Sequence, residues 1–249
     1  MLNMTHRWAL LPSLLISAPL LASECPVDRV IAHYQIQHTQ QTNSQEHELL
    51  LVRKGDRVLQ RFLQAQISEL WFQQRNGRIR PTRYFDQHQR GIEYQAAEVN
   101  QNNAQQLWQE KRQLITGAQR DAMTLLSDSG QGCNRRQRFH WQTGNSQAEL
   151  EWAPHSQLLV SYRLQHGSEF WQYQLKSHQH DRVAVDNELS QLQQYPTVDY
   201  ADVGDMENDP FLAQMINQGF LQHGASGFYN AQGESLGAQH KDHDHDHAH

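Results

Sequence analysis

The sequence predicts an α+β protein that is mainly β, in which two antiparallel meanders form a curved sheet or half-barrel and a few helices pack on it. Apolar and polar residues alternate with a period of two over two long stretches. Turn residues interrupt these stretches every eight to twelve residues, as in an up-and-down sheet. Helical spacing of apolar residues is confined to short segments between and after them.

The first meander is predicted from Arg29 to about Gln95. Apolar positions alternate over Val30–Ile36, and Lys54-Gly55-Asp56 supplies a turn cluster. Asn76-Gly77 is the clearest hairpin signal, because both residues tolerate the positive φ angles of a tight turn. Pro81 lacks a ladder donor, which predicts that its strand is bulged or lies at an edge.

A helical segment separates the two meanders. Apolar residues recur at helical spacing from Ala104 to Ile115, and a second short helix is expected over Ala122–Leu126. The cluster Ser127-Asp128-Ser129-Gly130 ends that helix. Cys133 follows directly.

The second meander is predicted from Arg138 to Leu175, with turns at Gly144-Asn145, Pro154-His155-Ser156 and His166-Gly167. In its last strand Trp171, Tyr173 and Leu175 share one face.

Helical patterning returns at Leu189 and Leu192 and ends before Pro196, which cannot continue a helix. A last helix begins at Asn208-Asp209-Pro210, where a polar cap precedes a proline in the first turn.

The N-terminus has the layout of a secretory signal peptide over residues 1–23. His6 and Arg7 give a weakly basic start, Trp8 to Leu21 is almost entirely apolar, and Ala22 and Ser23 are small. The apolar run is shorter than the roughly 20 residues that span a membrane. We therefore expect a periplasmic protein without a membrane span once the peptide is cleaved, folded as a single β-rich domain over residues 24–233.

Cys25 and Cys133 are the two cysteines of the chain. In an exported protein such a pair predicts a disulfide. The alternative is a metal site in which both thiols are joined by histidines, although neither cysteine has the nearby second thiol of zinc motifs.

Charge and motifs argue against two classes of function. Twenty-seven acidic and 21 basic residues give a net charge of −6, which disfavours nucleic-acid binding. The sequence contains no His-Glu-x-x-His, Cys-x-x-Cys or phosphate-binding glycine loop, so we expect no enzyme. A hydrolytic site built from distant residues stays open, because catalytic triads are defined in space.

The C-terminal tail, residues 234–249, carries the strongest chemical pattern and is expected to be disordered. Imidazoles bind zinc, copper and nickel, and the interspersed carboxylates add charge with little bulk. A purification tag is the alternative, but tags are usually uninterrupted histidines. The predicted ligands in the tail are His240, Asp242, His243, Asp244, His245, Asp246, His247 and His249.

A second pair of candidate ligands, His178 and His180, is separated by one residue. On a strand both side chains project from one face and can share a metal ion. The alternative is two solvent-facing histidines. Together with the tail, this pair suggests a soluble periplasmic protein that handles or buffers a divalent transition metal, with zinc first.

Two meanders separated by helices resemble, in outline, the LolA-like half-barrel of periplasmic lipoprotein carriers. The resemblance covers roughly residues 29–220 and rests on architecture, so it transfers no site residues. It implies a curved sheet closed by helices over an apolar groove. The alternative function is therefore a carrier of a lipid, lipoprotein or partner peptide in envelope assembly. A periplasmic or envelope protein or a lipid joins metal ions among the expected partners.

Overall fold

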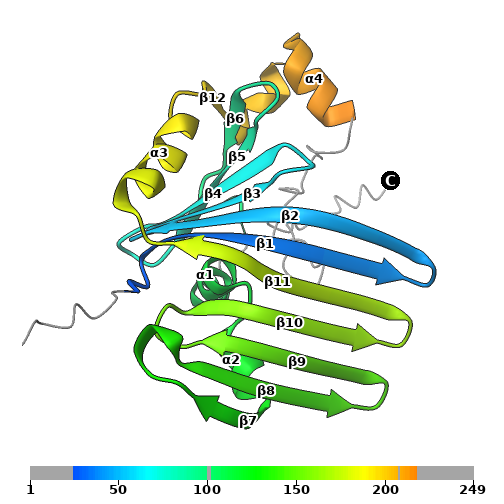
Figure 1. Ribbon diagram of the computed structural model, residues 1–249. Coiled ribbons are helices and arrows are strands. Elements are labelled where there is room, and N and C mark those ends of the chain that lie inside the picture. The colour runs from blue at the N-terminus through cyan, green and yellow to red at the C-terminus, as the bar shows by residue number, and fades with distance from the viewer. Residues whose placement is uncertain (1–24, 100–101, 207, 218–249) are drawn as a thin grey trace, which may run out of the picture.

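The computed structural model describes residues 25–99, 102–206 and 208–217. Within these ranges twelve strands form one open sheet in the order β12-β6-β5-β4-β3-β2-β1-β11-β10-β9-β8-β7 (Figure 1). Neighbouring strands are antiparallel except β12 and β6, which are parallel. The predicted fold class is confirmed: the protein is mainly β, with a large curved sheet and a few helices. The predicted signal peptide and the His-rich tail lie outside the described residues.

The first meander has six strands, and its register follows the predicted alternation. The first strand continues beyond the alternation predicted over Val30–Ile36, because its polar end pairs with the second strand across the hairpin, where the Gln37 amide donates to the Ser44 hydroxyl over 3.1 Å. Gln41 makes the turn between them with φ at 55°. The strands are β1 (Arg29–Gln40), β2 (Asn43–Lys54), β3 (Arg57–Phe62), β4 (Ile67–Gln73), β5 (Ile79–Phe85) and β6 (Arg90–Glu93).

The expectation for Pro81 is wrong, because β5 lies between β4 and β6 and the β5–β6 register contains no bulge. The carbonyl of Pro81 accepts a hydrogen bond from the amide of Tyr94, so the backbone nitrogen of Pro81 also faces the β6 side. Strand β6 ends at Glu93, and its ladder with β5 begins only at Thr82. Tyr94 therefore lies opposite Pro81, and the proline cannot return a second hydrogen bond to it, so the β5–β6 ladder ends at this pair.

The segment between the meanders contains α1 (Ala104–Gln113), α2 (Gly117–Asp121), β7 (Thr124–Ser129) and the 3₁₀ turn η1 (Gly132–Asn134). The helix expected over Ala122–Leu126 is wrong. Thr116 and Gln119 form a capping box that starts α2 earlier, and Leu125 then pairs with Phe139 as part of a strand.

The second meander is confirmed as β8 (Arg136–Thr143), β9 (Ser146–Ala153), β10 (Leu158–His166) and β11 (Glu169–Gln179). Its last strand pairs with β1, where Ile36 lies opposite Tyr173. The two predicted meanders are therefore halves of one continuous sheet.

The chain ends its described part with α3 (Arg182–Leu192), β12 (Thr197–Asp199), η2 (Tyr200–Asp205) and α4 (Pro210–Asn217). Both predicted C-terminal helices are present. The Asp209 carboxylate accepts a hydrogen bond from the Phe211 amide at the start of α4, which satisfies one backbone donor of the first turn.

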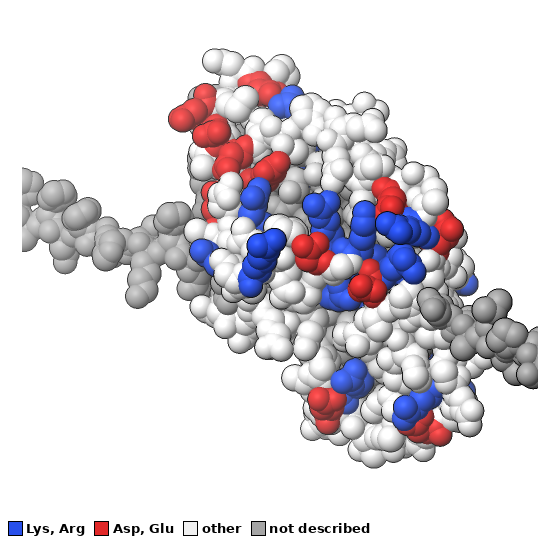
Figure 2. All heavy atoms as spheres, turned by 90° about the vertical axis from the view of Figure 1, so that its left-hand side faces the viewer, with Lys and Arg blue, Asp and Glu red and all other residues white. Residues whose placement is uncertain are grey.

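The β1–β6 half of the sheet is packed on both faces. On one face, side chains of α1, η2 and α4 join those of the strands in the main hydrophobic cluster. On the other face Val185, Leu189 and Leu192 of α3 pack against Ile31 and Leu50. Figure 2 shows acidic side chains among the basic ones on the α3 side of the molecule. Ion pairs attach this helix to the sheet, including Arg61–Glu188 at 2.8 Å and Lys54–Asp186 at 2.6 Å.

A buried arginine shows how strongly the sheet curves. Arg53 on β2 lies opposite Val30 of the main cluster and donates to the carbonyls of Ser156 and Gln157 over 2.8 and 3.0 Å. These two carbonyls belong to the β9–β10 turn, and strands β1 and β11 lie between β2 and β10. On a flat sheet this separation is about 14 Å, beyond the reach of a side chain. The face that carries Arg53 is therefore concave.

The predicted disulfide is confirmed: Cys25 and Cys133 are bonded, with their Cα atoms 5.8 Å apart. It joins the segment before β1 to the turn before β8. None of the helices in the described ranges is long and apolar enough to cross a membrane.

Candidate functional site

The concave face of β8–β11 carries a broad surface of aromatic and aliphatic side chains, which we call the aromatic face. Residues directly opposite one another on paired strands point to the same side of a sheet, so the register defines its members. One row runs across six strands through Ile36, Tyr173, Tyr162, Leu150, Phe139 and Leu125. A second row runs through His38, Trp171, Leu164, Ala148 and Trp141.

Burial on the aromatic face is incomplete, in contrast to the β1–β6 half. Leu150 and Ala148 at its centre are only 2% exposed. The larger members around them are half-buried: Phe139, Trp141, Tyr162, Leu164, Trp171 and Tyr173. This half of the concave face therefore keeps apolar surface that the described residues do not bury completely.

The aromatic face is uncharged across its middle. Burial raises the pKa of Tyr162 and raises that of Tyr173 to about 12, with the neighbouring Tyr162 and Glu110 adding to the second shift. A phenol is protonated at neutral pH even without such a shift, so these two present no charge to an apolar ligand.

A polar cluster lies at the hairpin end of the aromatic face. The ring of His38 stacks on Trp171 at 3.8 Å between centroids. One oxygen of Glu169 lies 2.9 Å from His38 Nε2 and accepts a hydrogen bond from Trp171 Nε1 over 3.0 Å. These hydrogen bonds lower the pKa of Glu169. The cluster fixes the orientation of the Trp171 ring and places a carboxylate where the apolar surface ends.

Helices α1 and α2 cover the other end of the concave side. Trp108 of α1 is 8% exposed within the main cluster, and the Gln60 amide donates to the Lys111 carbonyl over 2.9 Å. Arg120 of α2 lies over the ring of Trp152 at 5.3 Å from its centroid. The aromatic face is therefore bounded by helices at one end and by the polar cluster at the other.

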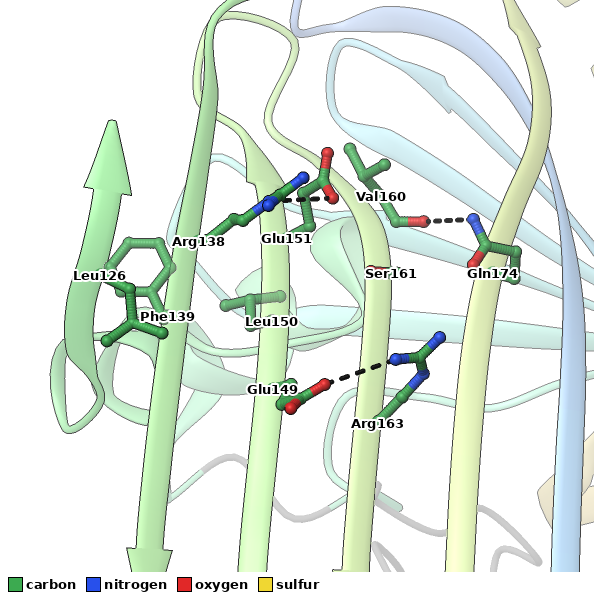
Figure 3. Close-up of a pocket in the computed structure, with 10 residues that line it drawn as sticks. All are labelled: Leu126, Arg138, Phe139, Glu149, Leu150, Glu151, Val160, Ser161, Arg163 and Gln174. Carbon is green, nitrogen blue, oxygen red and sulfur yellow. Dashed lines mark hydrogen bonds and ion pairs between the residues drawn. The ribbon is translucent and has the colours of Figure 1, made fainter. Parts of the chain in front are cut away.

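The convex side of the same strands has different chemistry. A shallow hollow of about 450 Å³ lies between their side chains (Figure 3). Two ion pairs cross it, Arg163–Glu149 at 3.4 Å and Arg138–Glu151 at 3.7 Å, and three of these four side chains are more than half exposed. Leu126, 66% exposed, lines the β7 side of the hollow. Because the charges are paired across strands, the hollow offers no unbalanced charge to a ligand.

The predicted histidine pair lies at the end of β11. The rings of His178 and His180 are 5.5 Å apart and arranged edge to face. His180 Nδ1 donates to the carbonyl of Arg29 over 2.8 Å, because that carbonyl can only accept. Burial lowers the pKa of His178, and His180 and Arg136 lower it further.

Metal ligation by these residues stays a prediction. No group of three potential metal-ligating side chains occurs among the residues whose placement is described. The tail ligands, His240 to His249 with Asp242, Asp244 and Asp246, lie outside those residues, so the structure does not test them.

Most members of the aromatic face were not predicted from the sequence. The face-sharing of Trp171 and Tyr173 was evident from their alternation, and Leu164 and Tyr162 show the same period of two. Their partners across the sheet come from strands up to about 50 residues away, and the β1–β11 pairing brings His38 to Trp171 over 133 positions. Alternation shows which side chains of one strand share a face, but it does not show which other strand pairs with that strand.

Comparisons with protein-family models and with curated protein sequences found no match. Solved structures overlap part of the fold. A PNGF-II structure gives a TM-score of 0.39 at 8% identity and covers 73% of this chain, which spans about a third (33%) of the length of that chain. A DUF1329 family protein from Desulfovibrio piger gives 0.34 at 8% identity, covering 63% of this chain and 87% of that one. A putative outer membrane lipoprotein-sorting protein domain from Vibrio parahaemolyticus gives 0.32 at 6% identity, covering 68% and 93%. Overlaps of this extent do not determine a function.

Proposed function

We propose that this protein is a carrier in envelope assembly that holds the acyl chain of a lipid or lipoprotein on the aromatic face. The observation that carries the proposal is the half-buried state of six large apolar and aromatic side chains on the concave side of β8–β11. Monomeric proteins rarely leave such a surface uncovered without a partner for it.

The shape and chemistry of the aromatic face favour an acyl chain. Its two rows lie across the strands, and neighbouring strands are about 4.8 Å apart, so four strands span about 14 Å between outer strand axes. Its middle is neutral because it contains no charged side chain, and burial moves the pKa values of Tyr162 and Tyr173 still further above neutral pH. The Glu169–His38–Trp171 cluster lies at its open end, where the polar part of a lipid would meet water. An acyl chain placed there gains stability by removing its own surface and that of the aromatic face from water.

Two neighbouring residues of β10 provide a matched test. Leu164 lies on the aromatic face, whereas Gln165 lies on the convex side and is exposed. We expect a dansyl-labelled undecanoic acid to bind the wild-type protein, and Leu164→Asp to weaken that binding at least tenfold, because a carboxylate in an apolar site must lose its hydration. Gln165→Asp adds the same charge on the other side and should change the Kd by less than twofold.

Near-UV circular dichroism must first show that both variants keep their tertiary packing. Failure of the wild-type protein to bind the probe would overturn the proposal. Equal weakening by Leu164→Asp and Gln165→Asp would also overturn it, because the effect would then follow from charge alone.

The alternation of histidine and aspartate in the tail favours a second candidate function, the handling or buffering of a divalent transition metal. Five imidazoles occur in the last ten residues, and zinc, copper and nickel all accept nitrogen ligands. Zinc titration by calorimetry would compare the full chain with a variant in which these five histidines are asparagine. Loss of binding in that variant would assign the metal to the tail. Loss only in His178→Asn/His180→Asn would assign it to the histidine pair, and no binding by the full chain would refute the candidate.

A further inference from the structure

The two edge strands of the twelve-stranded sheet differ in how far they are shortened or covered against pairing with another strand. At one edge β12 is only three residues long and runs directly into η2. At the other edge β7 has six residues, and every one of them is exposed. An edge strand presents backbone N–H and C=O groups that have no strand partner, and natural proteins usually shorten or cover such edges. Only the β12 edge is shortened in this way.

Strand β7 also concentrates the exposed apolar side chains of the protein. Among the described residues four large hydrophobic side chains are exposed: Leu63, Leu125, Leu126 and Val183. Two of the four are adjacent on β7, where Leu125 is 49% and Leu126 is 66% exposed. Leu126 stands at the bulge between β7 and β8 and lines the convex hollow. An edge strand with leucines on both of its faces is suited to pairing with another strand.

Most charges next to β7 are already paired within the chain; Arg136, opposite Ser129, instead donates to the backbone carbonyls of Cys133 and Arg135. Arg135 makes two hydrogen bonds with the carboxylate of Asp128, at 2.8 and 2.5 Å. Arg120 and Asp121 of α2 form a further pair at 3.3 Å. A strongly charged partner would find little complementary charge here. Two identical surfaces meet with their Asp128–Arg135 pairs already neutralised.

We infer that β7 pairs with β7 of a second copy of this chain, so that a twofold axis joins two sheets into one. A twofold axis perpendicular to a sheet makes an edge strand antiparallel to its own copy, and such an interface is self-complementary. Leu126 lies near the middle of β7, so its side chain meets the same residue of the second copy across the axis. The dimer covers the exposed edge and the two leucines. Of the aromatic face it covers only Leu125 at the end of the first row, and the side chains of β8–β11 stay open.

Analytical ultracentrifugation of the protein produced from its full sequence tests this inference. All runs contain EDTA, which prevents association through metal bound to the histidine-rich tail. We expect a concentration-dependent dimer of the wild-type chain. Leu126→Asp should raise the dimer Kd at least tenfold, because it places two carboxylates at the axis. Val183→Asp is the matched control, since Val183 is 65% exposed on α3 and far from the edge in sequence; it should leave the Kd unchanged within twofold.

A second measurement uses only the wild-type protein, so it does not require any variant to fold. Amide hydrogen exchange of the wild-type protein should slow in residues 124–129 when the concentration is raised across the dimer Kd, with no comparable change in β12. A wild-type monomer at all accessible concentrations would overturn the inference. So would a dimer that resists Leu126→Asp, a dimer weakened equally by Val183→Asp, or exchange in β7 that does not depend on concentration.

Discussion

The β1–β6 and β7–β11 halves of this sheet have the same alternation in sequence but very different burial. Leu51 on β2 and Leu164 on β10 are both apolar members of the concave face, yet Leu51 is 0% exposed and Leu164 is half-buried. In the first half, helices α1, α3 and α4 contribute side chains to the clusters on both faces. In the second half the convex side carries paired charges (Figure 3), and the concave side keeps half-buried aromatic rings.

The difference shows that the alternation of apolar and polar residues specifies which face of a strand is apolar, but not which element covers that face. A helix laid over the strands converts the apolar side into core. Without such a helix, the same pattern leaves a surface that can bind a partner. The first half is thus built for stability, and the second half offers the candidate binding surface.

The largest expected effect comes from removing the covalent tie between the centre of the sheet and the second half. Cys25→Ser/Cys133→Ser opens a loop closed over 108 positions, and loop entropy predicts a loss of about 4–5 kcal/mol in the free energy of unfolding. Urea denaturation without reductant measures the change. The double variant avoids an unpaired thiol. A loss below about 1 kcal/mol would mean that strand pairing alone holds the halves together.

The comparison between the halves can be tested directly with one residue type. Leu51→Ala removes a fully buried side chain and should cost about 2–5 kcal/mol of stability, because the cavity cannot fill completely. Leu164→Ala should cost less than about 1 kcal/mol, since its side chain is already partly in water. Urea denaturation of both variants gives the two values. Equal costs would show that the second half is as tightly packed as the first.

Arg53 connects the halves through polar contacts. Arg53→Met keeps much of the volume but leaves the carbonyls of Ser156 and Gln157 without their donor, which should cost about 1–3 kcal/mol. Amide exchange should accelerate near the β9–β10 turn more than in β4 and β5. A uniform acceleration would instead indicate global destabilisation without a local link.

The smallest expected effect concerns Asp209, which joins α4 to β6 in the first half. Arg90, 2.8 Å away, lowers the pKa of Asp209 below its usual value of 3.8, and the amides of Phe211 and Leu212 lower it further. Because the folded-state pKa is the lower one, the stabilisation is present above about pH 4 and is lost as the pH falls through the folded-state pKa.

Asn at position 209 still caps a helix but cannot carry this charge. Asp209→Asn should therefore reduce stability by less than about 1 kcal/mol at pH 7, and the difference should shrink at low pH. Urea denaturation of both proteins at pH 7 and pH 3 measures it. A difference that does not depend on pH would show that the ion pair contributes nothing.

The sequence predicted much of the fold because its signals are local. Alternation located most strands of both meanders, Asn76-Gly77 and the later glycine turns located the hairpins, and Asp209-Pro210 located the start of α4. The cysteine pair predicted the disulfide because two thiols, in a chain expected to be exported, leave one pairing. The errors were also local: Leu125 and Leu126 were assigned to a helix although they form an edge strand, since two adjacent leucines suit either structure.

Only the tertiary structure decided how the strands are ordered and which of them are covered. The β1–β11 pairing, the curvature that brings Arg53 to Ser156, and the aromatic face all depend on contacts between residues far apart in the chain. Apolar periodicity does not specify which distant strand is the hydrogen-bonding neighbour, because any two alternating strands can pair. The sequence by itself therefore determined the elements and the chemistry of each strand face. Three-dimensional packing determined that one half became core and the other a surface.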